Sequence, residues 1–386
     1  MAVMLVLVFL TASSITVTLP VKASSKTLVV PDDYPTINSA IGNATDGDMV
    51  LVKRGVYEEK PLEIDKSLSI IGEDPNSTII KVNAPIINMT QILSQIYTTI
   101  ADAIVINANG VKLSNLTIVT GGNIIAIGDR TQIIGNNIAS GSTEKGLVIN
   151  GSYCYITENI MQTRLTGGSV YSLISISGSF NTISKNSAYK IIITRDSNRI
   201  SYNTIDSIQM SNANNNVIYG NNISTSTIST RTADYGVRIV DNSSHNIIYN
   251  NNILALLNGV EINSKSAENN TFFHNNFLIK YSREPGRVYT YNLTLVNFWD
   301  NGKEGNYWED YNGTDSNRDG IGDTPYVIDG ANADNYPLMA PYDIENDTLV
   351  LPPPEPFPTA IVVAASAASV AAVIVGLLVY LKKRDH

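Results

Sequence analysis

One short phrase returns along residues 110–277 and limits the possible folds more than any other feature of the chain. It consists of an apolar residue, two spacers, an asparagine, one spacer and a second apolar residue. The asparagines recur at intervals of roughly 17 to 30 residues, the range of a solenoid coil. They are Asn136, Asn159, Asn186, Asn203, Asn221, Asn251 and Asn275.

A second pattern, an apolar–variable–apolar triplet, precedes each asparagine by roughly 10 to 14 residues. The triplets are residues 125–127, 147–149, 174–176, 191–193, 208–210, 237–239 and 260–262. Alternation at period two, rich in β-branched residues and bounded by turn formers, predicts two short strands in each repeat. Because one such unit cannot bury its apolar face alone, the copies are expected to stack into an all-β parallel β-helix.

The repeated asparagine is expected to form a ladder at a corner of the coil. Its side chain offers both a donor and an acceptor, so it can hydrogen-bond to the equivalent residue one coil away. Asparagine also tolerates a left-handed backbone better than most residues, so we expect it to occupy the turn itself.

Both ends of the chain predict export and tethering. Residues 1–23 resemble a secretory signal peptide, with an uncleaved N-terminal anchor as the alternative. Residues 359–381 form an apolar run long enough for a transmembrane helix, and the basic residues of 382–386 place the C-terminus in the cytoplasm. A Pro-rich stalk at 343–358 would separate this span from the repeats, which lie outside the cell.

Composition excludes one class of partner and makes the lone cysteine unremarkable. The formal net charge is −9, with 26 basic and 35 acidic residues, which argues against nucleic acid. Cys154 has no partner for an internal disulfide and stands where other coils carry asparagine, so we interpret it as a small buried residue. Sequons such as those at Asn222 and Asn312 agree with an exported glycoprotein.

The segment before the repeats is predicted to cap the solenoid. Residues 35–41 read as a short amphipathic helix with Ile37, Ala40 and Ile41 on one side. Short strands are expected at 27–30, 49–52, 62–64 and 68–71. An open coil end needs such a cover, because its apolar face would otherwise meet water. Residues 79–105 fit no repeat and are interpreted as a lateral flap.

Motifs at both ends carry a family resemblance. Residues 30–37 (VPDDYPTI), 46–48 (DGD), 55–57 (GVY) and 67–72 (SLSIIG) resemble the entry segment of right-handed β-helix proteins of the pectin-lyase-like superfamily. Residues 305–311 (GNYWEDY), 315–326 (DSNRDGIGDTPY) and 335–338 (NYPL) resemble the tail of its NosD-like branch, found on prokaryotic, especially archaeal, surfaces. The resemblance covers residues 27–342 and implies a right-handed coil. We accordingly expect a capped β-helix at 27–298 and a tail at 299–342.

The tail contains a calcium-type loop. Asp315, Asn317, Asp319 and Asp323 fall at positions 1, 3, 5 and 9, with the Ile321 carbonyl at position 7. Alternating oxygen ligands on a sharply turning backbone converge on a hard cation, so calcium is the expected cofactor. The alternative is a plain turn rich in Asp and Asn, because the loop lacks the glutamate of an EF-hand at position 12.

Aromatic residues gather just before this loop. They could stack on sugar rings, but the last coil also needs an apolar lid, and we favour the lid. The residues are Trp299, Tyr307, Trp308 and Tyr311.

The middle residue of each triplet points outward and supplies the inventory for chemistry. The row is Ala126, Val148, Ser175, Ile192, Gln209, Arg238 and Glu261. It is apolar or neutral until Gln209, Arg238 and Glu261, which fall on successive coils and form a polar row. We interpret Arg238 and Glu261 as a surface ion pair between coils, worth about 1 kcal/mol or less.

Catalysis is the competing hypothesis for this row. A glycosidase needs two carboxylates, and a lyase needs a base with a cation that stabilises the intermediate. Glu261 with Arg238 supplies part of either set, and Asp234 or Asp241 in the flanking turns could add a second carboxylate.

Copper, which the NosD-like resemblance suggests, is not expected. His245 and His274 fall five residues out of register, up to roughly 15 Å apart along the strands. Two imidazoles at that separation cannot share one metal ion.

We therefore predict a membrane-anchored extracellular β-helix that binds polysaccharide or glycoconjugate, or that serves as a surface-layer or adhesion element, and that is not an enzyme. The first alternative is a polysaccharide lyase or glycoside hydrolase. The second is an accessory factor for an extracytoplasmic metalloenzyme.

Overall fold

The structure, a computed structural model, describes residues 25–92, 95–140, 146–163, 173–225, 235–255, 258–279, 288–291 and 294–346. The predicted signal peptide, residues 347–358 of the stalk, the predicted membrane span and the basic tail lie outside these ranges. No helix within them is long and apolar enough to cross a membrane.

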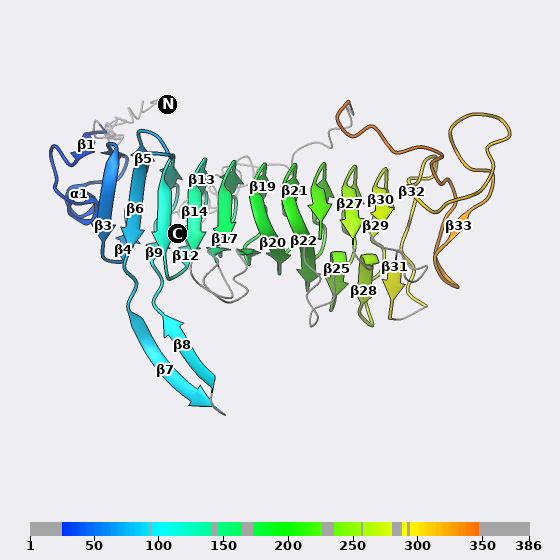
Figure 1. Ribbon diagram of the computed structural model, residues 1–386, viewed down its shortest axis with the longest axis horizontal. Helices are drawn as coiled ribbons and strands as arrows, with labels where there is room; N and C mark the ends of the chain where they lie inside the picture. The colour runs from blue at the N-terminus through cyan, green and yellow to red at the C-terminus, as the bar shows by residue number, and fades with distance from the viewer. Residues whose placement is uncertain are drawn as a thin grey trace, which may run out of the picture.

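The described chain forms an elongated rod of stacked parallel strands (Figure 1), so the predicted parallel β-helix is confirmed. Each coil contributes to three walls, and the first wall is a sheet of its own. Its strands are β1 (Thr27–Val30), β2 (Met49–Val52), β5 (Ser69–Gly72), β10 (Lys112–Ser114), β13 (Gln132–Ile134), β16 (Tyr155–Thr157), β19 (Thr182–Ser184), β21 (Arg199–Ser201), β23 (Val217–Tyr219), β26 (Ile247–Tyr249) and β29 (Thr271–Phe273).

The second wall follows the first within each coil. Its strands are β3 (Gly55–Glu59), β6 (Thr78–Val82), β11 (Thr117–Thr120), β14 (Asn137–Ser140), β17 (Ile160–Thr163), β24 (Asn222–Ser224), β27 (Asn252–Ala255), β30 (Asn276–Ile279) and β32 (Tyr307–Trp308).

The third wall closes the coil. Its strands are β4 (Leu62–Ile64), β9 (Ile104–Ile106), β12 (Ile124–Ala126), β15 (Leu147–Ile149), β18 (Leu173–Ile176), β25 (Tyr235–Val240), β28 (Asn258–Asn263) and β31 (Val288–Thr290). Two longer strands, β20 (Ser187–Ile193) and β22 (Thr204–Ser211), run through both the second and third walls and join them into one sheet.

The predicted asparagine ladder is present as a continuous chain of buried hydrogen bonds. In each step the backbone N–H and the Nδ2 of one asparagine donate to Oδ1 of the asparagine in the next coil. From Asn186 to Asn203 these distances are 2.9 and 3.0 Å, and from Asn221 to Asn251 they are 3.0 and 2.9 Å. The ladder therefore satisfies polar groups that the corner would otherwise bury unpaired.

A second ladder runs along the other corner of the first wall. It begins at the backbone N–H of Cys154, which donates to Asn181 Oδ1 at 2.7 Å. The predicted burial of Cys154 is confirmed, and burial raises the pKa of its thiol to about 11. The ladder continues through Asn198, Asn216, Asn246, Asn270, Asn297 and Asn332.

The left-handed backbone positions differ from the prediction. We expected the ladder asparagines themselves to turn the corner, but the residue before each one has the positive φ. Examples are Glu158 at 59°, Lys185 at 55° and Tyr202 at 55°. The asparagine side chain has to project along the stack to meet its neighbour, so the turn falls on the preceding residue.

Apolar columns fill the interior. The middle residues of the first-wall strands pair from coil to coil and are all fully buried: Leu113, Ile133, Ile156, Ile183, Ile200, Ile218, Ile248 and Phe272. Each contributes about 1.5–3 kcal/mol of hydrophobic stabilisation relative to exposure.

One predicted triplet has the wrong register. The structure pairs Ile124 with Leu147, so Ile124 and Ala126 face the core and Ile125 faces outward. The prediction for 125–127 placed Ala126 outward. An unbroken apolar run at this point carries no alternation that could fix which residues face in.

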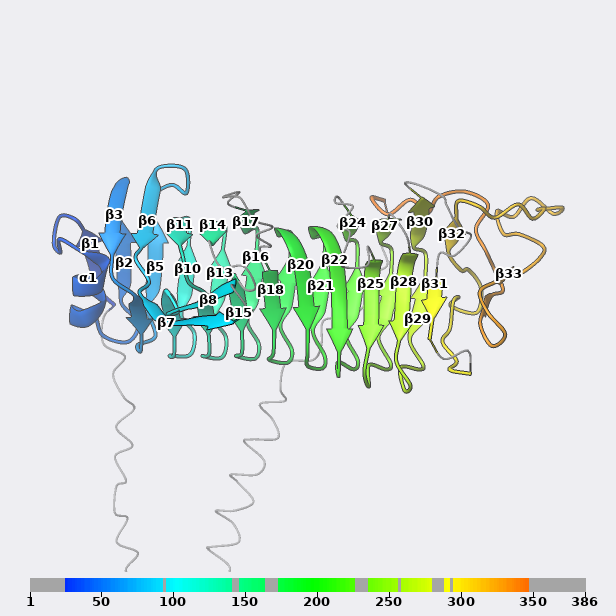
Figure 2. The same ribbon diagram turned by 60° about the horizontal axis from the view of Figure 1, so that its bottom comes forward.

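The predicted cap is confirmed at the N-terminal end. Helix α1 (Ile37–Asn43) buries Ile37, Ala40 and Ile41, and lies against the first strands of the rod (Figure 2). Thr36 closes its first turn with a capping box, and the Glu59 carboxylate accepts the Ile37 N–H at 2.6 Å. The helix thus replaces a missing coil.

The predicted flap is smaller than its expected range, because β6 and β9 belong to the solenoid. Between them an antiparallel hairpin of β7 (Ile86–Ile92) and β8 (Gln95–Ile100) projects from the rod (Figure 1).

The C-terminal tail closes the far end as an aromatic lid, which confirms the lid interpretation. Trp299 stacks on Phe272 and Trp308 stacks on Phe277, each with ring centroids 4.3 Å apart. Tyr326 stacks on the other side of Trp308, also at 4.3 Å. Both tryptophans are buried, so neither can serve as a platform for a sugar. Strands β33 (Tyr326–Val327) and β34 (Ala333–Asp334) complete this tail.

The first ladder ends on a carboxylate rather than an amide. Asn306 donates to Asp334 Oδ2 from its backbone N–H at 2.7 Å, and Trp308 Nε1 donates to the same oxygen at 2.8 Å. The Tyr336 N–H donates to Asp334 Oδ1 at 3.1 Å. A carboxylate accepts without needing to donate onward, which suits the last position of the stack. Burial raises the pKa of Asp334 to about 6, against the lowering effect of these hydrogen bonds.

Candidate functional site

The polar row lies on the outer face of the third wall as predicted. Strand register places Gln209 beside Arg238 and Arg238 beside Glu261, and it continues the row to Tyr289. The Arg238 Nε donates to Glu261 Oε2 at 2.6 Å. Neighbouring coils therefore bring these side chains into direct contact.

The Arg238–Glu261 pair is buried on one side, which corrects its interpretation as a surface ion pair. Glu261 is only 2% exposed, whereas Arg238 is 36% exposed. Asn263 Nδ2 donates to the other carboxylate oxygen, Oε1, at 3.1 Å. Removing one partner of such a pair lowers the stability of the fold more than removing one partner of a solvent-exposed ion pair, because a buried charge is left uncompensated. Glu261 is therefore placed to orient Arg238 rather than to meet a substrate.

Two residues that sequence reasoning missed complete this cluster. The Lys190 Nζ donates to Gln209 Oε1 at 2.7 Å, and burial, followed by the charge of Arg238, lowers the pKa of Lys190. The Tyr235 ring lies 5.7 Å from the Arg238 guanidinium carbon. Burial and the negative charge of Glu261 raise the pKa of Tyr235, so its phenol stays protonated.

An open pocket of about 630 Å³ lies next to the polar row, at the C-terminal ends of the strands that carry the row. It lies at the turns that follow the third-wall strands, and Asn263 belongs to both the pocket and the cluster. The residues that line it each carry an amide, hydroxyl or charged group: Asn212, Asp241, Asn242, Asn263, Ser264, Lys265, Ser266 and Tyr291. Tyr291 is 58% exposed and offers an aromatic surface at the rim.

The other predicted catalytic residues divide between this pocket and undescribed segments. Asp241 lines the pocket, where its Oδ2 accepts a hydrogen bond from the Ser211 hydroxyl at 2.5 Å. Asp234 lies outside the described residues. The structure therefore brings Asp241 close to the row through Asn263, but it gives Asp234 no position.

The calcium-type loop folds on its own backbone. Asp315 Oδ2 accepts the Gly320 N–H at 2.9 Å, and Asp319 Oδ1 accepts the Ile321 N–H at 2.9 Å. Asn317 Nδ2 donates to Asp319 Oδ2 at 2.9 Å. These contacts hold positions 1, 3 and 5 on one tight turn, and the Ile321 carbonyl follows directly.

The remaining oxygens of the loop are less favourable for a cation. Asp323 Oδ2 accepts the hydroxyls of Thr314 and Ser316 at 3.0 and 2.7 Å. These hydrogen bonds, that of Ser316 first, lower the pKa of Asp323. Asp329, six residues beyond the loop's Asp323, accepts a hydrogen bond from the Thr290 hydroxyl at 2.8 Å. In the described parts of the chain, no three Asp, Glu, His or Cys side chains gather as a metal site, and calcium binding stays a prediction.

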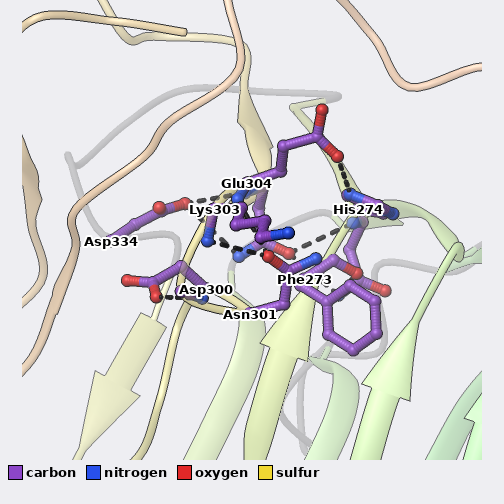
Figure 3. A network of polar contacts seen from close by, with 10 residues as sticks. Phe273, His274, Asp300, Asn301, Lys303, Glu304 and Asp334 are labelled. Carbon is purple, nitrogen blue, oxygen red and sulfur yellow. Dashed lines mark hydrogen bonds and ion pairs between the residues drawn. The ribbon is translucent and has the colours of Figure 1, made fainter.

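His274 belongs to the structural end of the rod. Its Nε2 lies 2.8 Å from Glu304 Oε2 (Figure 3). Its ring stacks on Tyr342, with ring centroids 3.9 Å apart. His245 precedes a residue of the second ladder, whereas His274 precedes one of the first, so a first-wall strand separates the two positions in each coil. The contacts with Glu304 and Tyr342 give His274 a structural role at this end of the rod.

The sequence signal for the missed residues was weak. Lys190 lies one position before a triplet, on a strand that passes through a corner the sequence pattern could not resolve. The pocket residues lie in turns, which have no periodicity. Polar side chains after successive third-wall strands, such as Asp241 and Ser264, were the available clue.

Comparisons with known proteins find distant structural likeness only. No family model matches the sequence, and no curated protein matches it. A mannuronic acid specific polysaccharide family 6 lyase from human gut microbiota has 15% identity and a TM-score of 0.41, covering 73% of this chain and 86% of that chain.

Two further solved structures lie in the same range. An alginate lyase from Paenibacillus has 13% identity and a TM-score of 0.41, covering 73% of this chain and 97% of that one. Pectin methylesterase PemA from Erwinia chrysanthemi has 11% identity and a TM-score of 0.36, covering 70% and 93%. Likeness at this level assigns no activity, so function has to be argued from the residues.

Proposed function

We propose that this chain is an exported, membrane-tethered β-helix protein that binds polysaccharide at the third wall. The observation that carries the proposal is the open pocket of about 630 Å³, joined through Asn263 to the Arg238–Glu261 pair. Amides, hydroxyls and an exposed tyrosine are the groups that hold a sugar through hydrogen bonds and ring stacking. Export and tethering are supported by the character of residues 1–23 and 359–381.

An acidic polysaccharide is the favoured ligand class. Lys265 lines the pocket, and Arg238, a member of the polar row, is partly exposed. A guanidinium held by a buried carboxylate presents its remaining N–H groups in a fixed direction, which suits a sugar carboxylate. A role as a surface-layer or adhesion element follows from such binding.

Binding to immobilised acidic and neutral polysaccharides tests the proposal. Replacing the two pocket residues together, Tyr291→Ala with Lys265→Ala, is expected to weaken binding of acidic polysaccharide at least tenfold. Tyr155→Ala is the matched control, because Tyr155 is an exposed aromatic residue of the first wall. Equal loss of binding in both variants, or no binding by the parent protein, contradicts the proposal.

A β-eliminating lyase is the second candidate, favoured by the lowered pKa of Lys190 beside Arg238. In such a reaction a base removes the proton next to the sugar carboxyl group, the bond to the leaving oxygen breaks, and that oxygen takes up a proton. Lys190 would be the base and Arg238 would stabilise the charge of the intermediate.

Product analysis separates the two candidates. Unsaturated ends that form with the parent protein and disappear in Lys190→Met, while binding remains, would establish the lyase. If the protein binds polysaccharide but forms no unsaturated product, the result supports a binding protein without lyase activity. The NosD-like assignment stays a prediction from the end motifs.

A further inference from the structure

The outer surface of the first wall carries an aromatic column that faces away from the core. Tyr219, Tyr249 and Phe273 occupy the third position of successive strands, so they point outward while Ile218 and Ile248 point inward. Their rings stack at 5.2 and 5.1 Å and are nearly parallel. They form an apolar cluster separate from the main core.

This column is buried although it lies on the outside of the rod. Tyr249 has 0% exposure. Stacking covers the two flat faces of its ring, and Val217 and Ile247 of the same wall pack against the cluster, so only the outward edge of the ring needs a further cover. The burial continues along the same column through Thr157, Ser184 and Ser201, in coils with no aromatic residue at that position.

The described chain ends at the head of this column. Tyr342 stacks on His274 at 3.9 Å, and His274 packs edge-on against Phe273. Asn276 holds Tyr342 from both sides: it accepts the Tyr342 N–H at 2.7 Å, and its Nδ2 donates to the Tyr342 carbonyl at 3.0 Å. After closing the end of the rod, the tail has thus returned to the corner beside the column.

We propose that residues 347–358 dock along the outer face of the first wall, over the column from Phe273 toward Thr157. Five coil steps separate these residues, about 24 Å at about 4.8 Å a step. An extended or polyproline segment covers this distance with about eight residues. The segment supplies matching chemistry, since Leu349, Val350 and Leu351 are followed by Pro352–Pro354. Proline-rich chains in this conformation dock on aromatic grooves.

Docking would hold the stalk against the rod. The predicted membrane anchor would then continue from the first wall rather than from the C-terminal end of the rod. The first wall faces the anchored side, and the pocket on the third wall remains accessible.

Photo-cross-linking of the full chain in detergent tests this docking. The photoreactive residue p-benzoylphenylalanine replaces Tyr249, and in a second variant Tyr202, which is 50% exposed and packs edge-on against Tyr219. Mass spectrometry is expected to find both cross-linked to residues 347–358. The same replacement at Tyr291, on the third wall, serves as the control and is expected to give no such adduct.

Two further experiments test whether residues 347–358 of the same copy cover the column. Leu349→Asp with Leu351→Asp is expected to lower the cross-linking yield about tenfold, because two buried apolar contacts are lost. A mixture of light and heavy isotope-labelled protein distinguishes cross-links within one copy from those between copies. Adducts only between copies, adducts elsewhere in the chain, or an unchanged yield in the double variant would overturn the proposal.

Discussion

The corners and the third wall of the same rod follow opposite rules. Along the corners the ladders repeat one residue, asparagine, because each side chain binds the next copy of itself, as Asn203 binds Asn221. Other residues stand only where a ladder begins or ends, at Cys154 and Asp334. On the outer face of the third wall the residues change from coil to coil, from Ile192 to Gln209 to Arg238 to Glu261. Positions fixed by stacking repeat, whereas positions free of stacking can differ, and those are the ones available for function.

The largest expected effect lies in the ladder. Asn221→Ala removes the acceptor of the Asn203 N–H and Nδ2, and it also removes the donor to Asn251. Leaving these buried groups unpaired is expected to lower the free energy of unfolding by about 3–5 kcal/mol. Asn222→Ala, one residue further and exposed, is the control and is expected to change it by less than about 0.5 kcal/mol. Chemical denaturation measures both, and similar losses would contradict the comparison.

The second-largest expected effect is a pH dependence of the free energy of unfolding, which arises from Asp334 at the end of the ladder. Asp334 has a pKa raised from 3.8 to about 6, so its contribution to stability is fully present below about pH 4 and is lost as the pH rises through 6. The shift corresponds to about 3 kcal/mol as an order of magnitude. The difference in unfolding free energy between the parent and Asp334→Asn, measured from pH 4 to 7, isolates this group from other carboxylates. A difference independent of pH would show that Asp334 does not titrate in this range.

The third wall predicts effects on binding rather than on stability. Tyr291→Ala removes an exposed ring at the pocket rim and is expected to weaken polysaccharide binding about five- to tenfold, with little change in unfolding. Isothermal titration and thermal unfolding of the same samples check both parts. A loss of stability comparable to that of Asn221→Ala would show that Tyr291 stabilises the fold rather than serving binding.

How far the sequence predicts the molecule follows the same division. Asn159, Asn186 and Asn203 were predictable because a ladder requires a fixed offset between asparagine and the core isoleucine. Ile125 was misplaced because a run of four apolar residues hides the alternation. The second ladder was visible as asparagines in place of Cys154 in other coils, but without hydrogen bonds its role could not be assigned.

The candidate site was only partly predictable. The outward direction of Glu261 follows from strand alternation, but its burial depends on neighbours brought together from separate coils, such as Arg238 and Asn263. The contact of Lys190 with Gln209 depends on a strand that continues through a corner, which no periodic pattern indicates. The pocket forms from turns of unequal length, so its shape exists only in the folded rod.

The smallest expected effect concerns the calcium-type loop, which lies neither at a ladder corner nor on the third wall. If the loop binds calcium, a concentration three times the dissociation constant stabilises the folded chain by about 0.8 kcal/mol. Asp319→Asn removes a charge from the turn and is expected to abolish the gain. Asp310→Asn, outside the loop, is the control and is expected to retain it. Thermal unfolding with calcium and with a chelator measures the difference; an identical midpoint in both conditions for the parent protein would identify the loop as a plain Asp- and Asn-rich turn closed by its own backbone contacts.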